Sequence, residues 1–304
     1  GDISGLSVST PTNARLKGAA NSLPTAANLV TQGGGDIAVK AGGNIFGGVF
    51  YAATGQLDIA AAGVVGSAGT GVTLALGGSK VVVEAGQGVV ADRIIDPFLT
   101  AQASGNITGT GLTGNINRIT YFSGYNADSS VDLTTLSGDV ALGTGTVAPP
   151  SIKLASLDGS ISLTGGGFTM APAARGKLGL FAADSIVFDA SYLIMSDAPT
   201  SALASPLTPK LVLAEAIAVS NKHSSPVLHE GDPEPVRIVA LRGDIEGYTE
   251  ANSLVLPKRA TIIAGGDITN LGVVAQNLAD TDISRIDAGG AIVFESTRNS
   301  SGGL

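Results

Sequence analysis

Five aspartates could supply the paired carboxylates that hydrolysis of a polysaccharide requires. Such enzymes need two acids roughly 5 to 10 Å apart, with pKa values pushed in opposite directions by their surroundings. They also line a groove with aromatic rings and basic residues, whereas this chain has 8 Phe, 5 Tyr, no Trp and only 17 Lys plus Arg, which are scattered. We therefore expect no enzymatic activity. The five candidate acids are Asp132, Asp139, Asp158, Asp184 and Asp189.

A second group of chemically capable residues lies within 12 positions near residue 230. His223, His229, Glu230, Asp232 and Glu234 are ligand types for zinc or for a hard cation. Their spacing fits no regular element, and the segment is rich in proline. We expect a solvated acidic loop here, with neither a metal site nor a cofactor.

Three short motifs match known signatures. Arg242-Gly243-Asp244 is the tripeptide that integrin receptors recognise on exposed loops, and it is the one candidate receptor-binding site in the chain. Residues 109–114 fit the dinucleotide pattern GxGxxG, but a strand pattern follows where that fingerprint needs a helix. Asn106 begins a glycosylation sequon. Both the sequon and the Gly-Asp of the tripeptide belong to a wider repeat, which favours a structural role for them.

The composition limits the elements that could position these residues. The 304 residues include 43 Gly and 44% hydrophobic residues, but only 14% charged residues, against roughly a quarter in typical globular domains. The core must therefore consist of small aliphatic side chains, which suits a narrow cross-section. The net charge of -8 argues against nucleic acid as a partner, and the lack of Cys excludes disulfides and thiolate metal sites.

A repeated tripeptide organises the chain. A Gly, usually an Asp or Asn, and then a β-branched residue recur, with Gly-to-Gly steps of 21, 23 and 24 where copies follow without interruption. A period of this size indicates a solenoid in which each repeat is one coil. The clear copies begin at Gly1, Gly35, Gly43, Gly105, Gly114, Gly138, Gly243 and Gly266, with relaxed copies at Gly159 and Gly290.

Between the glycines, apolar residues occupy every second position, which predicts short strands. A coil of about 23 residues then holds about three short strands, and the chain makes roughly 11 to 13 coils over about 50 to 60 Å. In each turn we expect the glycine to adopt a positive φ and the Asx side chain to bond nearby backbone. Asp244 and Asp267 would be adjacent copies that could attract a cation, but we expect offset turns to separate their charges instead.

One segment interrupts the repeat. Residues 199–235 contain six of the 13 prolines and both histidines, so we expect a loop that leaves the stack. This divides the chain into coils at 1–196, an excursion at 197–235, and coils at 236–304 of the same stack. The uncharged stretch 59–79 is long enough to cross a bilayer, but its six glycines and alternating residues predict strands instead.

The repeat resembles the shaft of bacterial filamentous haemagglutinin-like exoproteins, which belong to the two-partner secretion family. The resemblance extends over about 138–295, whereas the first third shows only the generic repeat. Its most specific pieces are 229–240 (HEGDPEPVRIVA), 243–245 (GDI), 256–259 (LPKR), 264–268 (AGGDI) and 276–277 (QN).

This resemblance implies a right-handed parallel β-helix, all-β, that is secreted or held at the outer surface of a Gram-negative bacterium. It implies export of the parent chain by a partner outer-membrane transporter, and adhesion to a ligand on a host or neighbouring cell, as in a biofilm. The chain shows no signal peptide and starts without Met, so we expect a piece of a longer protein.

We expect a non-catalytic rod segment of an adhesin or fibre, without membrane insertion, whose ends could self-associate. The alternatives are a β-helical polysaccharide lyase or hydrolase, and a carbohydrate-binding module with the 199–235 loop as its platform.

Overall fold

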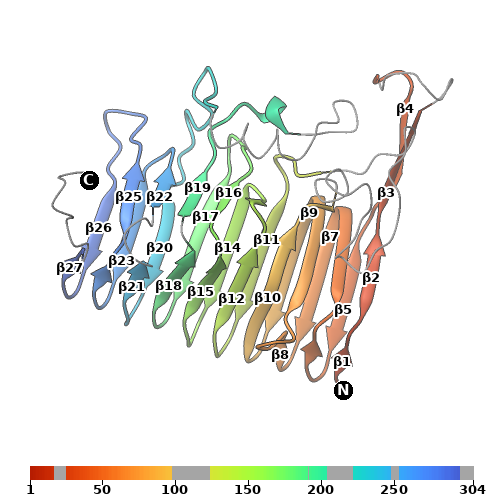
Figure 1. Cartoon of the computed structure of the whole chain (residues 1–304), viewed down its shortest axis with the longest axis horizontal. Helices are drawn as coiled ribbons and strands as arrows, with labels where there is room; N and C mark the ends of the chain where they lie inside the picture. Colours follow the sequence, from red (N-terminus) through yellow and green to blue (C-terminus); the bar gives the residue numbers. More distant parts are fainter. Residues whose placement is uncertain (17–24, 98–123, 191, 204–221, 248–252, 295–304) are drawn as a thin grey trace.

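The computed structural model is a parallel β-helix whose coils stack along one axis (Figure 1). It describes the chain except for residues 17–24, 98–123, 191, 204–221, 248–252 and 295–304. The described part includes a short 3-10 turn, η1 (Thr200–Ala202). The predicted fold class of repeated short parallel strands is thus confirmed, and no helix in these ranges is long and apolar enough to cross a membrane.

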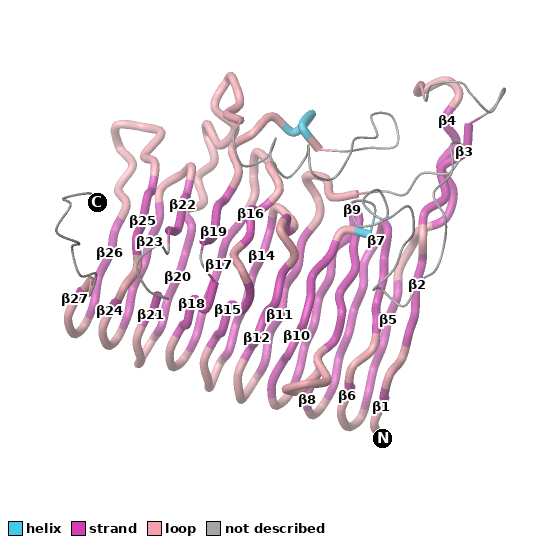
Figure 2. The backbone as a smooth tube through the Cα atoms, viewed as in Figure 1, coloured by secondary structure: helices cyan, strands magenta, loops and turns pink. Residues whose placement is uncertain are grey.

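Each coil contributes strands to three faces, and Figure 2 shows their regular succession. The first face comprises β5 (Ile37–Ala41), β7 (Val49–Ala61), β9 (Val72–Ala85), β11 (Ser130–Thr135), β14 (Ser151–Ser156), β17 (Lys177–Ala182), β20 (Val236–Ala240), β23 (Ala260–Ala264) and β26 (Arg285–Ala288). The second comprises β1 (Ile3–Ser4), β6 (Ile45–Phe46), β8 (Val64–Val65), β10 (Gly88–Ile95), β12 (Val140–Thr144), β15 (Ile161–Gly165), β18 (Ile186–Ala190), β21 (Ile245–Gly247), β24 (Ile268–Thr269) and β27 (Ile292–Val293).

The third face changes character along the rod. In the first coils, β2 (Ser7–Thr10) pairs with the start of β7, which pairs with the start of β9, because these long strands bend from one face into the next. Further along, a separate sheet forms this face. It comprises β13 (Val147–Ala148), β16 (Phe168–Met170), β19 (Tyr192–Met195), β22 (Ser253–Leu256) and β25 (Gly272–Ala275).

Equivalent residues of successive coils lie directly over one another. On the second face, Val140 pairs with Ile161, and the same column continues through Ile186, Ile245 and Ile268. These five side chains are at most 3% exposed. The alternation read from the sequence therefore places the β-branched residues of this column inside the rod, where they pack on their copies above and below.

Among the described residues, ten strands follow one another on the second face, fewer than the 11 to 13 coils expected from length. The estimate was too high because residues leave the stack in places that the repeat did not reveal. One is an antiparallel hairpin of β3 (Thr12–Leu16) and β4 (Leu29–Gly33), inserted between β2 and β5 and projecting from the first coils (Figure 1).

The Pro-rich segment departs from the stack between β19 and β20. Its described residues, 197–203 and 222–235, contain η1 and turns but no strand. The coils on its two sides nevertheless pair directly, β17 with β20 and β18 with β21. The excursion therefore interrupts the sequence of the rod without interrupting its sheets.

Candidate functional site

The polar residue of the tripeptide bonds the next coil, in line with the rod axis. Asp267 N–H donates to Asp244 Oδ1 (2.6 Å), and Ala291 N–H donates to Asp267 Oδ1 (2.6 Å). Ser160 N–H likewise donates to Asp139 Oδ1 (2.8 Å). The expectation of offset turns at Asp244 and Asp267 is wrong, because each carboxylate is separated from the next by a backbone N–H that it accepts. Their alignment needs no cation.

This ladder also explains the glycine before each polar residue. A Cβ at Gly266 would lie 2.0 Å from Asp244 Oδ1, and a Cβ at Gly290 would lie 2.0 Å from Asp267 Oδ1. Neither glycine has a positive φ, although Gly138 does (φ 73°). The prediction that the glycines serve by their backbone conformation is therefore wrong at Gly266 and Gly290, where the reason is close approach of the preceding coil.

The candidate receptor-binding tripeptide is engaged within the rod. The Arg242 guanidinium donates to Asp184 (Nη2 to Oδ1, 3.0 Å) and to Asp158 (Nη2 to Oδ1, 3.2 Å) on the two preceding coils. These carboxylates raise the pKa of Arg242. A Cβ at Gly243 would meet Ser185 Oγ at 2.3 Å, and Asp244 belongs to the ladder. These contacts give the tripeptide a structural role, and receptor binding stays a prediction.

The five candidate acids do not lie together in one site. Arg242 brings Asp158 and Asp184 together on the exposed turns, where their side chains are 67% and 51% exposed. Asp132 pairs with Lys153 on the first face (2.8 Å), and Asp189 lies on β18 of the second face. The fifth, Asp139, belongs to the ladder.

The charged side chains of the acidic loop pair with several different residues. Asp232 pairs with Lys258 (2.7 Å) and Glu234 with Lys177 (2.7 Å), whereas His223 Nδ1 lies 2.9 Å from both carboxylate oxygens of Asp197. Within the described residues, no three His, Asp or Glu side chains are arranged to hold a metal ion. The segment is therefore bound to the coils rather than simply solvated.

The ion pair of Asp232 and Lys258 is buried at the foot of the excursion, with side chains 4% and 3% exposed. Lys258 Nζ also donates to the carbonyl of Gly176 (2.8 Å). Burial alone would raise the pKa of Asp232, but hydrogen bonds from Lys258 and from the Glu234 N–H outweigh it and lower that pKa. The neighbouring Arg259 bonds the carbonyl of Pro233 and the carboxylate of Asp282. Two turns that sequence analysis treated separately, 229–235 and 257–259, are thus held together.

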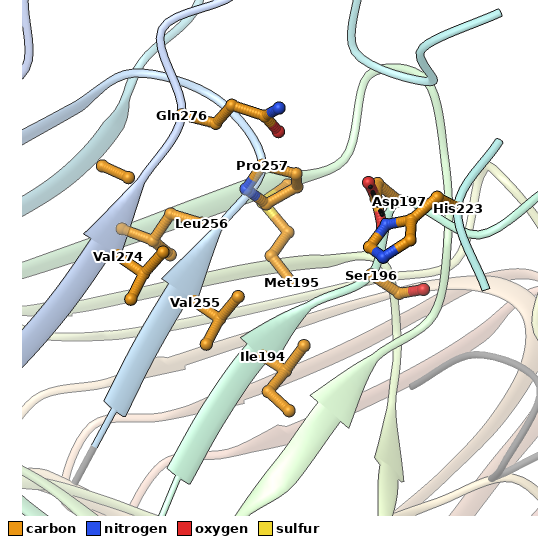
Figure 3. A pocket seen from close by; sticks show the side chains of 11 residues that line it. Ile194, Met195, Ser196, Asp197, His223, Val255, Leu256, Pro257, Val274 and Gln276 are labelled. Carbon is orange, nitrogen blue, oxygen red and sulfur yellow. Dashed lines mark hydrogen bonds and ion pairs between the residues drawn. The ribbon is translucent and has the colours of Figure 1, made fainter. Parts of the chain in front are cut away.

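A lateral pocket lies where the excursion meets the third face (Figure 3). Its volume is about 360 Å³, within the range of about 300 to 1,000 Å³ typical of small-ligand pockets. Outward side chains of three paired strands form its floor, and the hydrogen-bonded pair of Asp197 and His223 lies on its other side. The lining includes the apolar residues Ile194, Val255 and Val274 and the polar residues Asp197, His223 and Gln276.

Sequence analysis missed this pocket, although a signal was present. In β19, β22 and β25 the alternation fails, since apolar residues also occupy outward positions. Ile194 and Val255 are half-buried and Val274 is 60% exposed, whereas their neighbours Met195 and Leu256 are at most 2% exposed. Outward aliphatic residues on three neighbouring strands mark an apolar surface on the rod.

Two sequence motifs lie outside the described residues, namely the GxGxxG match at 109–114 and the sequon at Asn106. Comparisons of the chain with protein-family models, with curated proteins and with solved structures found no match.

Proposed function

We propose that the chain is a non-catalytic rod segment of a bacterial adhesin or extracellular fibre of the filamentous haemagglutinin-like kind. In this proposal the parent chain is exported by a partner outer-membrane transporter and is held outside a Gram-negative cell. The observation that carries the proposal is the in-register column from Val140 to Ile268, accompanied by the side-chain ladder on the turns. Both features favour lengthwise stiffness, and neither requires a ligand.

Insertion of residues 1–294 into the shaft of an exported filamentous haemagglutinin-like protein tests this function. The shaft should lengthen by about 48 Å, because each of the ten coils that contribute a described strand to the second face adds one step of about 4.8 Å. Electron microscopy of the secreted fibres measures the length, and immunoblots of the medium measure export. A matched insert with Val140→Asp and Ile161→Asp should block export or leave a collapsed shaft. Export without lengthening by the unaltered insert would contradict the proposal.

The lateral pocket favours a second function, binding of a neutral saccharide. Aliphatic residues can cover the apolar face of a sugar ring, while Asp197, His223 and Gln276 offer groups for its hydroxyls. The net charge of -8 disfavours acidic sugars.

An array of neutral and acidic oligosaccharides tests this second function. Val255→Asp should abolish binding of neutral glycans, whereas Leu136→Asp, at a position 66% exposed on another part of the rod, should not affect it. A lack of glycan binding by the unaltered chain would remove this candidate and leave the rod proposal standing.

A further inference from the structure

The buried histidine at the foot of the excursion has no role in the rod or in the lateral pocket. His229 is 1% exposed, and neither ring nitrogen makes a hydrogen bond of good geometry. The charged groups that act on its ring are Lys258, from the turn between β22 and β23, and Asp232, from its own segment. Backbone groups of Ser196 and Ala174 also lie near enough to act on it.

The charges of Lys258, Asp232 and His229 sum to zero only while the imidazole of His229 is neutral. Lys258 and Asp232 already compensate each other at 2.7 Å, so a proton on His229 would leave one buried positive charge in excess. Burial lowers the pKa of His229, and the Lys258 charge lowers it further, against smaller opposing effects of Asp232 and of the backbone at Ser196 and Ala174. Exposure of the ring to water would restore an ordinary pKa of about 6.5.

We propose that His229, Asp232 and Lys258 form an acid-sensitive latch, which holds residues 229–235 against the coils at neutral pH and releases them in mildly acidic solution. The sign follows from proton binding. Because the released segment binds a proton more readily than the held segment, attachment is strongest above about pH 6.5 and weakens as the pH falls below it. Release leaves the columns of the rod intact.

The composition allows the titration of His229 to be tested without interference from many other groups. The chain has two histidines, and apart from the amino terminus no other group ordinarily titrates between about pH 5.5 and 7.5. The second histidine, His223, is exposed and already paired with Asp197, so it serves as the matched control. A second ion pair, between Lys177 and Glu234 (2.7 Å), also joins the segment to the coils.

Hydrogen exchange of the whole chain at about pH 7.5 and 5.5, corrected for intrinsic rates, measures release. Protection of amides in 229–235 should fall up to about tenfold at the lower pH, because one pH unit below an ordinary histidine pKa shifts the equilibrium by that factor. Amides of β20 and β23 should keep their protection. His229→Gln should remove the pH dependence, and His223→Gln should preserve it.

A histidine titration by NMR on the unaltered chain covers the case in which His229→Gln does not fold. The proposal requires that one imidazole have a pKa below 6.5 and that its titration coincide with the loss of amide protection in residues 229–235. Equal protection at both pH values, pH dependence that persists in His229→Gln, or a His229 pKa at or above 6.5 would each overturn the proposal.

Discussion

At the scale of single residues, the glycine of the tripeptide lies against the preceding coil, whereas the Asx side chain accepts a hydrogen bond from the following coil. Asp244 occupies the space that a side chain at residue 266 would need, and it accepts the N–H of Asp267. The repeated tripeptide therefore reflects a contact between neighbouring coils rather than the backbone conformation of one turn. Any larger residue at position 266 would collide with Asp244.

Gly266→Ala should therefore destabilise the rod by about 2 kcal/mol, because the new methyl group must displace Asp244 from its hydrogen bond. Urea unfolding followed by far-ultraviolet circular dichroism measures the change. Gly166→Ala is the control, since a Cβ there meets no atom within 4 Å and the backbone has no positive φ. Equal stability of both variants would refute the steric explanation.

Removal of one partner from the buried ion pair should be more costly. Lys258→Met leaves the carboxylate of Asp232 buried without its counter-ion, and we expect a loss of about 3 kcal/mol in the free energy of unfolding. Lys177→Met breaks an exposed pair and should cost less than about 1 kcal/mol. Both losses are measured by urea unfolding.

The double variant Lys258→Met with Asp232→Asn checks the cause. It should recover part of the lost stability, since no unpaired charge remains buried. If it is no more stable than Lys258→Met alone, packing of the lysine stem and not its charge accounts for the loss.

At the scale of elements, the excursion is an insertion into a turn that needs only three residues. In the next coil, residues 257–259 join β22 to β23, whereas 196–235 join the equivalent β19 and β20. The register supports this equivalence, because Ile194 pairs with Val255 and Val236 pairs with Ala260.

Replacement of residues 196–235 by the sequence Pro-Lys-Arg should therefore preserve the β-helix. We expect an unchanged strand signal in circular dichroism and an unchanged length in small-angle X-ray scattering, because β17 and β20 still pair. Binding at the lateral pocket should disappear, since Asp197 and His223 are removed. Loss of the strand signal would show that the excursion supports the stack.

At the scale of the whole molecule, the strands of each coil in the described stack pair only with strands of the coils before and after it. Stability is then close to a sum of coil and interface contributions, as in other solenoids. The last described coil illustrates this, because Ile286 and Ile292 are 43% and 63% exposed although their column partners Ile262 and Ile268 are at most 3% exposed.

Duplication of residues 245–267, one complete coil, should lengthen the rod by about 4.8 Å without changing its cross-section. The melting temperature should rise, because one more interface is buried. Small-angle X-ray scattering gives both dimensions, and thermal unfolding gives the stability. A wider cross-section, or a lower melting temperature, would show that the coils are not interchangeable.

The sequence by itself determined the coil, its period and its inward columns, because alternation and glycine spacing are local patterns that recur with every copy. It also marked the Pro-rich excursion, since proline cannot join a strand ladder. Tertiary structure alone decided that Asp244 fills the space beside Gly266, that Lys258 pairs with Asp232, and that Ile194, Val255 and Val274 form one pocket floor. These contacts join residues from different coils, so they depend on the register of stacking and on the path of the inserted segments, which no local pattern specifies.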